Sequence, residues 1–280
     1  MKNIVVATKP NIGYYQIMVE SCKKNNIELV VLGLNKKWEG FTMRFKLWMD
    51  YLDTLDDNEI VMLNDAYDVV FLQDSSIILN KFKKFNKKVV FSIQSGFLTE
   101  MLFPKCLDKV ICMGNIIGYV KDIKNIIKII VENKDLWEKY KNDDQYIFNK
   151  ICSKSDIIKN LIGLDTKREI FFVVPDTNRY KFKYILNGDI DDLKMINKNI
   201  VNQDNNPISV LHLSSNMNGK KYLEYLNYDT SSISFITEKY KFKQFLSLYS
   251  NIILTILFLV LLVSVIKFRK YLYKLIKNKK

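Results

Sequence analysis

Residues 60–71, IVMLNDAYDVVF, run as an apolar segment into two aspartates and then become apolar again. Residues 60–63 have the β-branched and large apolar composition of a buried strand. Asp65 and Asp68 follow directly, although aspartate is a poor strand former and a buried carboxylate is costly without a partner. The stretch therefore predicts a strand that ends at a turn carrying two carboxylates.

Short apolar runs alternate with helical patterns on both sides of this stretch. The runs typical of strands are residues 4–7, 28–32, 59–63, 89–93 and 208–213. The segments with helical periodicity are residues 42–55, 78–85, 123–131 and 144–151. This alternation predicts an α/β, Rossmann-like domain in which helices flank a mixed, mainly parallel sheet. Ligands bind such sheets beyond the carboxyl ends of the strands, which is where Asp65 and Asp68 lie.

The composition is that of a folded protein with a basic tail. The chain has 280 residues, 48% of them hydrophobic, and a formal net charge of +13. Seven of the basic residues lie in residues 267–280, and the other lysines are scattered among acidic residues. Nucleic-acid grooves need a basic stripe interleaved with aromatic residues, which this sequence lacks. We therefore predict no nucleic-acid partner.

Residues 245–266 form an uncharged apolar stretch that ends against the basic tail, residues 267–280. A helix needs ~20 apolar residues to cross a bilayer, so the stretch predicts one C-terminal transmembrane helix. Residues 1–228 are then the folded domain and residues 229–244 a linker.

The membrane side of the domain is open to two interpretations. The first residues contain only a short apolar run and no cleavage site, so they predict a strand and not a signal peptide. The chain also has no Asn-x-Ser/Thr sequon. Both observations favour a single-pass membrane protein with a cytosolic domain. The basic tail would itself prefer the cytosolic side, and this would place the domain on the other side of the membrane.

The four cysteines, Cys22, Cys106, Cys112 and Cys152, are far apart and form no CxxC pair. This spacing argues against a thiolate metal site and against a disulfide framework. We interpret them as buried thiols in a reducing compartment and leave a single bridge open.

Asp65 and Asp68 are hard oxygen ligands of the kind that Mg²⁺ or Mn²⁺ prefers. A metal ion there could bridge a nucleotide diphosphate, while the alternative is an Asx-type turn that closes the strand. His212 is the only histidine and ends a late apolar strand ahead of an Asn-Gly turn. It is either a packed residue or a third ligand in the form of a neutral imidazole.

Separated blocks of the sequence occur in a characteristic order. They are VVATKPN, RFKLWMDYL, IVMLNDAYDVVF, MGNIIGYV, NDDQYIFNKI and LHLSSNMNGK, all within residues 3–227. In order and spacing they resemble the glycosyltransferase domain of procollagen lysyl hydroxylases and related collagen-type glycosyltransferases. The resemblance implies a GT-A-like domain that uses a UDP-sugar and Mn²⁺ (or Mg²⁺), with Asp65, Asp68 and His212 as metal ligands.

The resemblance also implies roles around the nucleotide. Thr8 matches a position beside the nucleotide, and Arg44 stands where relatives usually carry a phosphate-binding lysine. Gly219 and either Lys220 or Lys221 match the glycine and lysine that contact the diphosphate. Plain alternatives are a capping role for Thr8 and a solvated helix charge for Arg44.

Asp143 and Asp144 precede a helical pattern, so helix capping is one interpretation of the pair. In the relatives this D-D-Q block faces the sugar. The resemblance thus implies catalytic work for Asp143 and Asp144, as a general base or in orienting sugar hydroxyls.

The chain departs from these relatives at two places. Asn115 stands where they carry a glycine, and residues 93–104 lack the tryptophan that they place near the acceptor. We predict a membrane-anchored hexosyltransferase that moves galactose or glucose from UDP-galactose or UDP-glucose to a hydroxyl of a protein or glycan, such as hydroxylysine in a collagen-like chain. The alternative is a catalytically impaired GT-A-like binding or scaffolding module tethered to a membrane.

Overall fold

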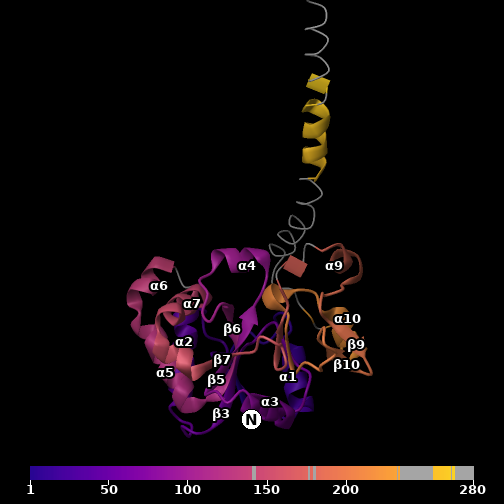
Figure 1. Ribbon diagram of the computed structural model, residues 1–280. Helices are drawn as coiled ribbons and strands as arrows, with labels where there is room; N and C mark the ends of the chain where they lie inside the picture. Colours follow the sequence, from indigo (N-terminus) through magenta and orange to yellow (C-terminus); the bar gives the residue numbers. More distant parts are fainter. Residues whose placement is uncertain are drawn as a thin grey trace, which may run out of the picture.

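The computed structural model describes residues 1–140, 143–175, 177–178, 181–231, 233, 255–265 and 267–268 (Figure 1). Strands and helices alternate along the first two thirds of the chain and build an α/β domain. The predicted fold class is therefore confirmed at the level of a mixed sheet flanked by helices.

The main sheet has six strands in the order β2-β1-β3-β6-β5-β7. The strands are β1 (Lys2–Val6), β2 (Glu28–Leu32), β3 (Ile60–Asp65), β5 (Val89–Gln94), β6 (Val110–Tyr119) and β7 (Ile162–Leu164). β6 runs antiparallel to its neighbours β3 and β5, and the other pairs are parallel. β6 carries the MGNIIGYV block and was not among the predicted strands, because its run is apolar without alternation and is buried on both faces.

Helices cover both faces of this sheet (Figure 1). On one face α2 (Phe41–Leu52), α5 (Val120–Glu132) and α7 (Asp144–Lys154) share a core with the strands. On the other face lie α1 (Tyr15–Lys24) and α3 (Ser75–Lys84). The remaining helices are α4 (Phe97–Leu102), α6 (Lys134–Tyr140), α8 (Asp156–Leu161), α9 (Phe182–Asn187) and α10 (Lys220–Tyr225).

A second, three-stranded sheet has the order β4-β11-β8. Its strands are β4 (Val69–Phe71), β8 (Phe171–Val173) and β11 (Val210–His212). β11 is antiparallel to β4, with His212 opposite Val69. This register places the last residue of β11 beside the turn that joins β3 to β4. A short hairpin of β9 (Lys194–Ile196) and β10 (Asn199–Val201) lies further along the chain.

The cysteines correct one interpretation. Cys106 and Cys152 form a disulfide with 5.6 Å between their Cα atoms, and the free cysteines among the described residues are the buried Cys22 and Cys112. α7 packs against β6, and this packing joins two residues 46 positions apart. Spacing along the chain gave no sign of which cysteines pair. The preferred interpretation as thiols is therefore wrong for Cys106 and Cys152, and the single bridge that was left open is present.

The C-terminal segment is described only in part. The predicted span, residues 245–266, falls outside the described residues at 245–254 and at 266, and a helix covers residues 255–265. Within the described ranges no helix is both long enough and apolar enough to cross a membrane. The transmembrane helix therefore stays a prediction.

Candidate functional site

The two aspartates lie where the main sheet passes into the second sheet. Asp65 is the last residue of β3 and Asp68 directly precedes β4. The turn between them is fixed by Tyr67, whose hydroxyl accepts hydrogen bonds from the backbone N–H groups of Thr8 (2.8 Å) and Lys9 (3.1 Å). Backbone pairing therefore holds both carboxylates at the predicted carboxyl edge of the sheet.

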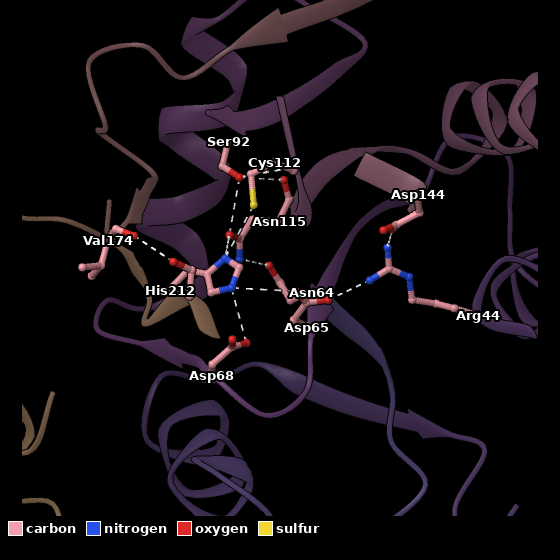
Figure 2. A network of polar contacts seen from close by, with 11 residues as sticks. Arg44, Asn64, Asp65, Asp68, Ser92, Cys112, Asn115, Asp144, Val174 and His212 are labelled. Atoms are coloured by element: carbon pink, nitrogen blue, oxygen red, sulfur yellow. Dashed lines mark hydrogen bonds and ion pairs between the residues drawn. The ribbon is translucent and has the colours of Figure 1, made fainter. Parts of the chain in front are cut away.

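His212 completes a cluster with these aspartates (Figure 2). Its Nε2 lies 3.7 Å from Asp65 Oδ2 and 3.3 Å from Asp68 Oδ1. One potential ligand atom from each of the three residues lies within 4.8 Å of the others. The geometry thus brings together the three residues that were predicted to hold a metal ion.

A ladder of buried asparagines orients the histidine. Asn115 Nδ2 donates to Asn64 Oδ1 (2.8 Å), and Asn64 Nδ2 donates to Asn3 Oδ1 (2.8 Å). These bonds leave Asn115 Oδ1 facing His212 Nδ1 at 2.7 Å, so the ring nitrogen donates to it. In the neutral ring the Nε2 lone pair then points to Asp65 and Asp68, as a metal ligand requires.

The charge of the cluster acts strongly on the histidine. Burial alone would lower the pKa of His212, but the negative charge of Asp68 and its hydrogen bond, with a contribution from Cys112, raise that pKa well above its usual value. The protein therefore holds a site that favours positive charge between its carboxylates. A metal cation can occupy the same position once the imidazole proton leaves.

Gly114 leaves the space that the cluster needs. A Cβ atom added there would lie 2.5 Å from Asp65 Oδ2 and 2.5 Å from His212 Cε1. Both distances are far below van der Waals contact, so a larger residue would displace two of the three candidate ligands. The first glycine of the MGNIIGYV block, Gly114, is thus explained by the close approach of side chains.

Arg44 bridges two carboxylates. Its Nη1 lies 2.7 Å from Asp65 Oδ1, and its Nη2 forms an ion pair with Asp144. The guanidinium stacks over Trp48 at 4.6 Å and is buried. It is therefore not the solvated helix charge of the alternative interpretation, while the predicted phosphate contact stays a prediction.

Asp143 and Asp144 have different environments. Asp143 is exposed and caps α7, because its Oδ1 accepts from the N–H of Tyr146 at 2.9 Å. Asp144 is buried, and burial raises its pKa to about 6 with help from Asp65 and Asp143, although Arg44 opposes the rise. Asp144 alone of the pair faces a cavity.

Two cavities meet at the cluster. The larger, of about 550 Å³, is here called the aromatic cavity and is lined by Trp38, Phe41, Tyr67, Thr8, Val6, Ala66 and Asn216, together with Arg44, Asp65 and Asp68. The other, of about 350 Å³, is called the polar cavity; its lining includes Gln94, Thr99, Phe103, Gly114, Asp144, Gln145 and His212, again with Arg44, Asp65 and Asp68. The two aspartates thus stand between two places where parts of one ligand can bind.

The late glycine and lysines lie elsewhere. Gly219 donates its N–H to the Tyr14 hydroxyl at 3.0 Å and precedes α10. Lys221 forms an ion pair with Asp189. Neither of these residues nor Lys220 lines the two cavities, so their predicted contact with a diphosphate stays a prediction.

Sequence reasoning missed four residues of the site: Trp38, Tyr67, Asn115 and Asn216. Tyr67 lies within the D-A-Y-D motif itself, and Asn115 was noted only as a departure from a glycine. Asn216 has a left-handed φ of 53°, and its buried Oδ1 has no hydrogen-bond partner in the described part of the chain. A left-handed asparagine beyond a strand cannot be recognised from one sequence, because Asn adopts this conformation at many turns.

The chain is similar in sequence to several known proteins. The chain is 28% identical over 212 residues to the multifunctional procollagen lysine hydroxylase and glycosyltransferase of Caenorhabditis elegans, which covers 69% of this chain and 26% of that protein. It is 27% identical over 186 residues to procollagen-lysine,2-oxoglutarate 5-dioxygenase 1 of Gallus gallus, covering 60% and 24%. The chain thus spans about a quarter of the length of these curated relatives.

A solved structure and a family model complete the comparison. The galactosyltransferase LgtC, solved with donor and acceptor sugar analogues, is 17% identical and has a TM-score of 0.45, covering 87% of this chain and all (100%) of that chain. The model of the PLOD GT domain matches residues 1–239, which include every residue of the cluster and of both cavities. The chain belongs to the family of PLOD glycosyltransferase (GT) domains.

Proposed function

We propose that this chain is a GT-A-like, metal-dependent hexosyltransferase. It would move galactose or glucose from UDP-galactose or UDP-glucose to a hydroxyl of a protein or glycan acceptor. Hydroxylysine in a collagen-like chain is the acceptor that the names of the relatives suggest. The observation that carries the proposal is the meeting of Asp65, Asp68 and His212 at the boundary of two cavities.

The donor atoms of the cluster fit Mn²⁺ or Mg²⁺. Asp65 and Asp68 offer carboxylate oxygens, and His212 offers a neutral nitrogen, a mixed set that Mn²⁺ accepts. Asn115 fixes the tautomer that leaves Nε2 available. A bound ion would supply positive charge that stabilises the diphosphate as it leaves.

The aromatic cavity suits the nucleotide. Its volume of about 550 Å³ lies within the range of roughly 300–1,000 Å³ typical of small-molecule sites. Trp38 and Tyr67 offer ring surface to a base, and the unpartnered Oδ1 of Asn216 can accept a hydrogen bond from the ligand. A nucleotide seated here has its diphosphate beside Asp65 and Asp68.

The polar cavity suits the sugar and the acceptor hydroxyl. In transfer, the acceptor oxygen bonds to the anomeric carbon, the bond from that carbon to the phosphate oxygen breaks, and UDP leaves with the electron pair. The hydroxyl proton needs a base. Asp144 faces this cavity with a pKa raised to about 6, so its carboxylate can receive the proton or hold a sugar hydroxyl.

The test is metal-dependent use of the donor. The full chain is incubated with UDP-galactose or UDP-glucose and Mn²⁺, and UDP release and UDP binding are measured with and without EDTA. We expect both signals to require the metal and to disappear in Asp65→Asn/Asp68→Asn. The matched control is Asp135→Asn, at an exposed aspartate of α6.

Metal-independent binding, or equal binding by the two variants, would contradict the proposal. Metal-dependent binding without UDP release from any donor and acceptor pair would instead support the binding module that the altered acceptor segment first suggested.

We also propose that residues 245–266 anchor the chain in a membrane, with residues 229–244 as a linker. The missing sequon supports a cytosolic domain, whereas the disulfide between Cys106 and Cys152 supports an oxidising compartment. Protease digestion of sealed vesicles decides between the two sides. A domain that is digested without detergent is cytosolic, and a domain that is protected lies on the other side.

A further inference from the structure

A third pocket lies beyond the carboxyl end of β5. It has a volume of about 270 Å³ and is here called the β5 pocket. Gln94, the last residue of β5, lines both this pocket and the polar cavity. α4 adjoins both spaces, because Thr99 lines the polar cavity and Glu100 lines the β5 pocket. A ligand that occupies the polar cavity can therefore extend past Gln94 into a second space.

One wall of the β5 pocket is a tethered turn. Cys106 and Lys109 exchange backbone hydrogen bonds of 2.8 Å and 3.2 Å, and Leu107 and Asp108 between them both have positive φ. The disulfide from Cys106 to Cys152 ties this turn to α7, the helix that carries Asp144. Lys109 is thus presented on a support fixed relative to the polar cavity.

A second part of the pocket wall is also fixed. The buried carboxylate of Asp165 accepts hydrogen bonds from the N–H groups of Glu169, Ile170 and Phe171, at 2.9, 2.8 and 2.7 Å. These bonds close the loop that carries Lys167. A pocket whose walls are ordered beforehand loses little conformational entropy when it binds a ligand.

The charges of the pocket favour an anion. Arg168 is satisfied within the protein, because it pairs with Asp192 at 3.2 Å and donates to Ser95 Oγ at 2.7 Å. Lys109 and Lys167 are exposed and form no ion pair with a carboxylate of the described residues. Asp108, on the same turn as Lys109, also lines the pocket, and Glu100 faces Lys105 at 4.0 Å. The four basic and three acidic side chains of the lining leave an excess of one positive charge, which attracts a negatively charged group.

The lining of the pocket suits a peptide. The aromatic ring in the lining, Phe172, is fully buried beneath the guanidinium of Arg168, at 5.0 Å from its ring centre, so it offers no face to a sugar ring. Gln94 and Gln203 bring side-chain amides to the pocket, and amides pair with both groups of a peptide bond.

We propose that the β5 pocket is an acceptor subsite for an acidic peptide. A carboxylate beside the acceptor residue binds between Lys109 and Lys167, and the acceptor hydroxyl reaches the polar cavity past Gln94. This inference rests on the proposed transferase function and adds the class of acceptor to it.

The test compares matched acceptors. The full chain with Mn²⁺ and UDP-sugar is offered pairs of hydroxylysine peptides that differ only in Glu or Gln beside the hydroxylysine. The variant Lys109→Glu/Lys167→Glu is compared with the control Lys121→Glu/Lys128→Glu, which reverses two exposed charges on α5.

We expect wild type and control to prefer the Glu peptide by about tenfold in kcat/KM. This lies below the ceiling of about 25-fold that two exposed ion pairs of up to about fivefold each allow. The Lys109→Glu/Lys167→Glu variant should lose or reverse this preference. The ratio between two peptides cancels any general loss of activity. Equal kcat/KM for both peptides in the wild type, or an equal loss in the control, would overturn the inference.

A binding measurement keeps the pocket separate from the transferase proposal. The same peptides carry a fluorophore, and their anisotropy is measured with the protein, UDP and Mn²⁺. If no peptide is glycosylated, the transferase proposal fails for these acceptors. The binding measurement then still tests whether the β5 pocket binds an acidic peptide. Tighter binding of the Glu peptide that disappears in Lys109→Glu/Lys167→Glu supports the subsite, and equal binding of both peptides overturns it.

Discussion

The two halves of the candidate site solve the problem of charge in different ways. Asp65, Asp68 and His212 stand at strand ends and are supported by neutral asparagines. Arg44 and Asp144 stand on helices and neutralise each other in a buried ion pair (Figure 2). Arg44 and Asp144, here called the helical half, balance each other's charge. Asp65, Asp68 and His212, here called the strand half, place two carboxylates together with too little positive charge to balance them. The difference indicates where an external cation belongs, and Asp65 joins the two halves because it also contacts Arg44.

The largest expected effect is the loss of stability when the ion pair of Arg44 with Asp144 is broken. Arg44→Met leaves Asp144, whose side chain is 8% exposed, without its cation. Removing one partner of a buried ion pair typically costs ~3–5 kcal/mol of unfolding free energy. Urea unfolding of the metal-free protein measures this loss.

The control for Arg44→Met also removes the carboxylate of Asp144. Arg44→Met/Asp144→Asn should recover at least half of the lost stability, because the buried carboxylate of Asp144 is gone and only the more exposed Asp65 has lost its contact with Arg44. A surface ion pair contributes up to about 1 kcal/mol. A smaller loss of unfolding free energy in Arg44→Met would show that the pair of Arg44 and Asp144 does not behave as a buried ion pair.

The next largest effect concerns metal binding by Asp65, Asp68 and His212. Gly114→Ala places a methyl group 2.5 Å from both Asp65 Oδ2 and His212 Cε1, so these ligands must move. We expect Mn²⁺ affinity, measured by isothermal titration calorimetry, to fall by about 10–100-fold, as for disturbed supports of metal ligands. The matched control is Gly163→Ala, which meets the flexible Lys87 side chain and should leave Mn²⁺ affinity unchanged.

A smaller effect tests the asparagine ladder. Asn115→Ala removes the acceptor that holds His212 Nδ1, and we expect about tenfold weaker Mn²⁺ binding. Asn3→Ala removes an equally buried amide at the far end of the ladder. Both variants should lose stability, but only Asn115→Ala should lose metal affinity; an equal loss of affinity in both would show that the ladder acts through stability alone.

The last prediction is a pH dependence of the stability that comes from Asp144. The pKa of Asp144 is raised from 3.8 to about 6, so between these values the folded state binds more protons than the unfolded state. Stability therefore falls as pH rises through this window, by at most about 1.4 kcal/mol per pH unit for one group. Urea unfolding in EDTA measures it as the difference between wild type and Asp144→Asn. A difference that stays constant from pH 4 to pH 6 would contradict the raised pKa.

The sequence pattern predicted the strand-end positions of Asp65, Asp68 and His212, whereas their grouping into a metal site was implied by the family resemblance. The ion pair of Arg44 with Asp144 was not predicted. Residues 60–65 form a local signal, an apolar run followed by acids, and the histidine likewise ends an apolar run. Such signals depend on neighbouring residues alone. Asp144 meets Arg44 across 100 positions of the chain, and no periodicity records a pairing of that kind.

Two other features needed the tertiary structure for the same reason. β6 enters the sheet between β3 and β5, although it follows both in the chain. That insertion places Asn115 opposite Asn64, and the packing of α7 on β6 accompanies the disulfide between Cys106 and Cys152. Each feature depends on which strands lie next to each other in the sheet, and a single sequence does not reveal this.

The asparagine ladder has a consequence for folding fidelity. Asn3, Asn64 and Asn115 come from three adjacent strands, and their amides meet in one alignment of β1, β3 and β6. A slip of one residue would turn each side chain to the other face of the sheet and leave buried amides unpaired. A misaligned sheet would also deprive His212 of its partner. If the cluster binds a metal ion as proposed, a copy of the chain with misaligned strands would therefore bind that ion more weakly than a correctly folded copy.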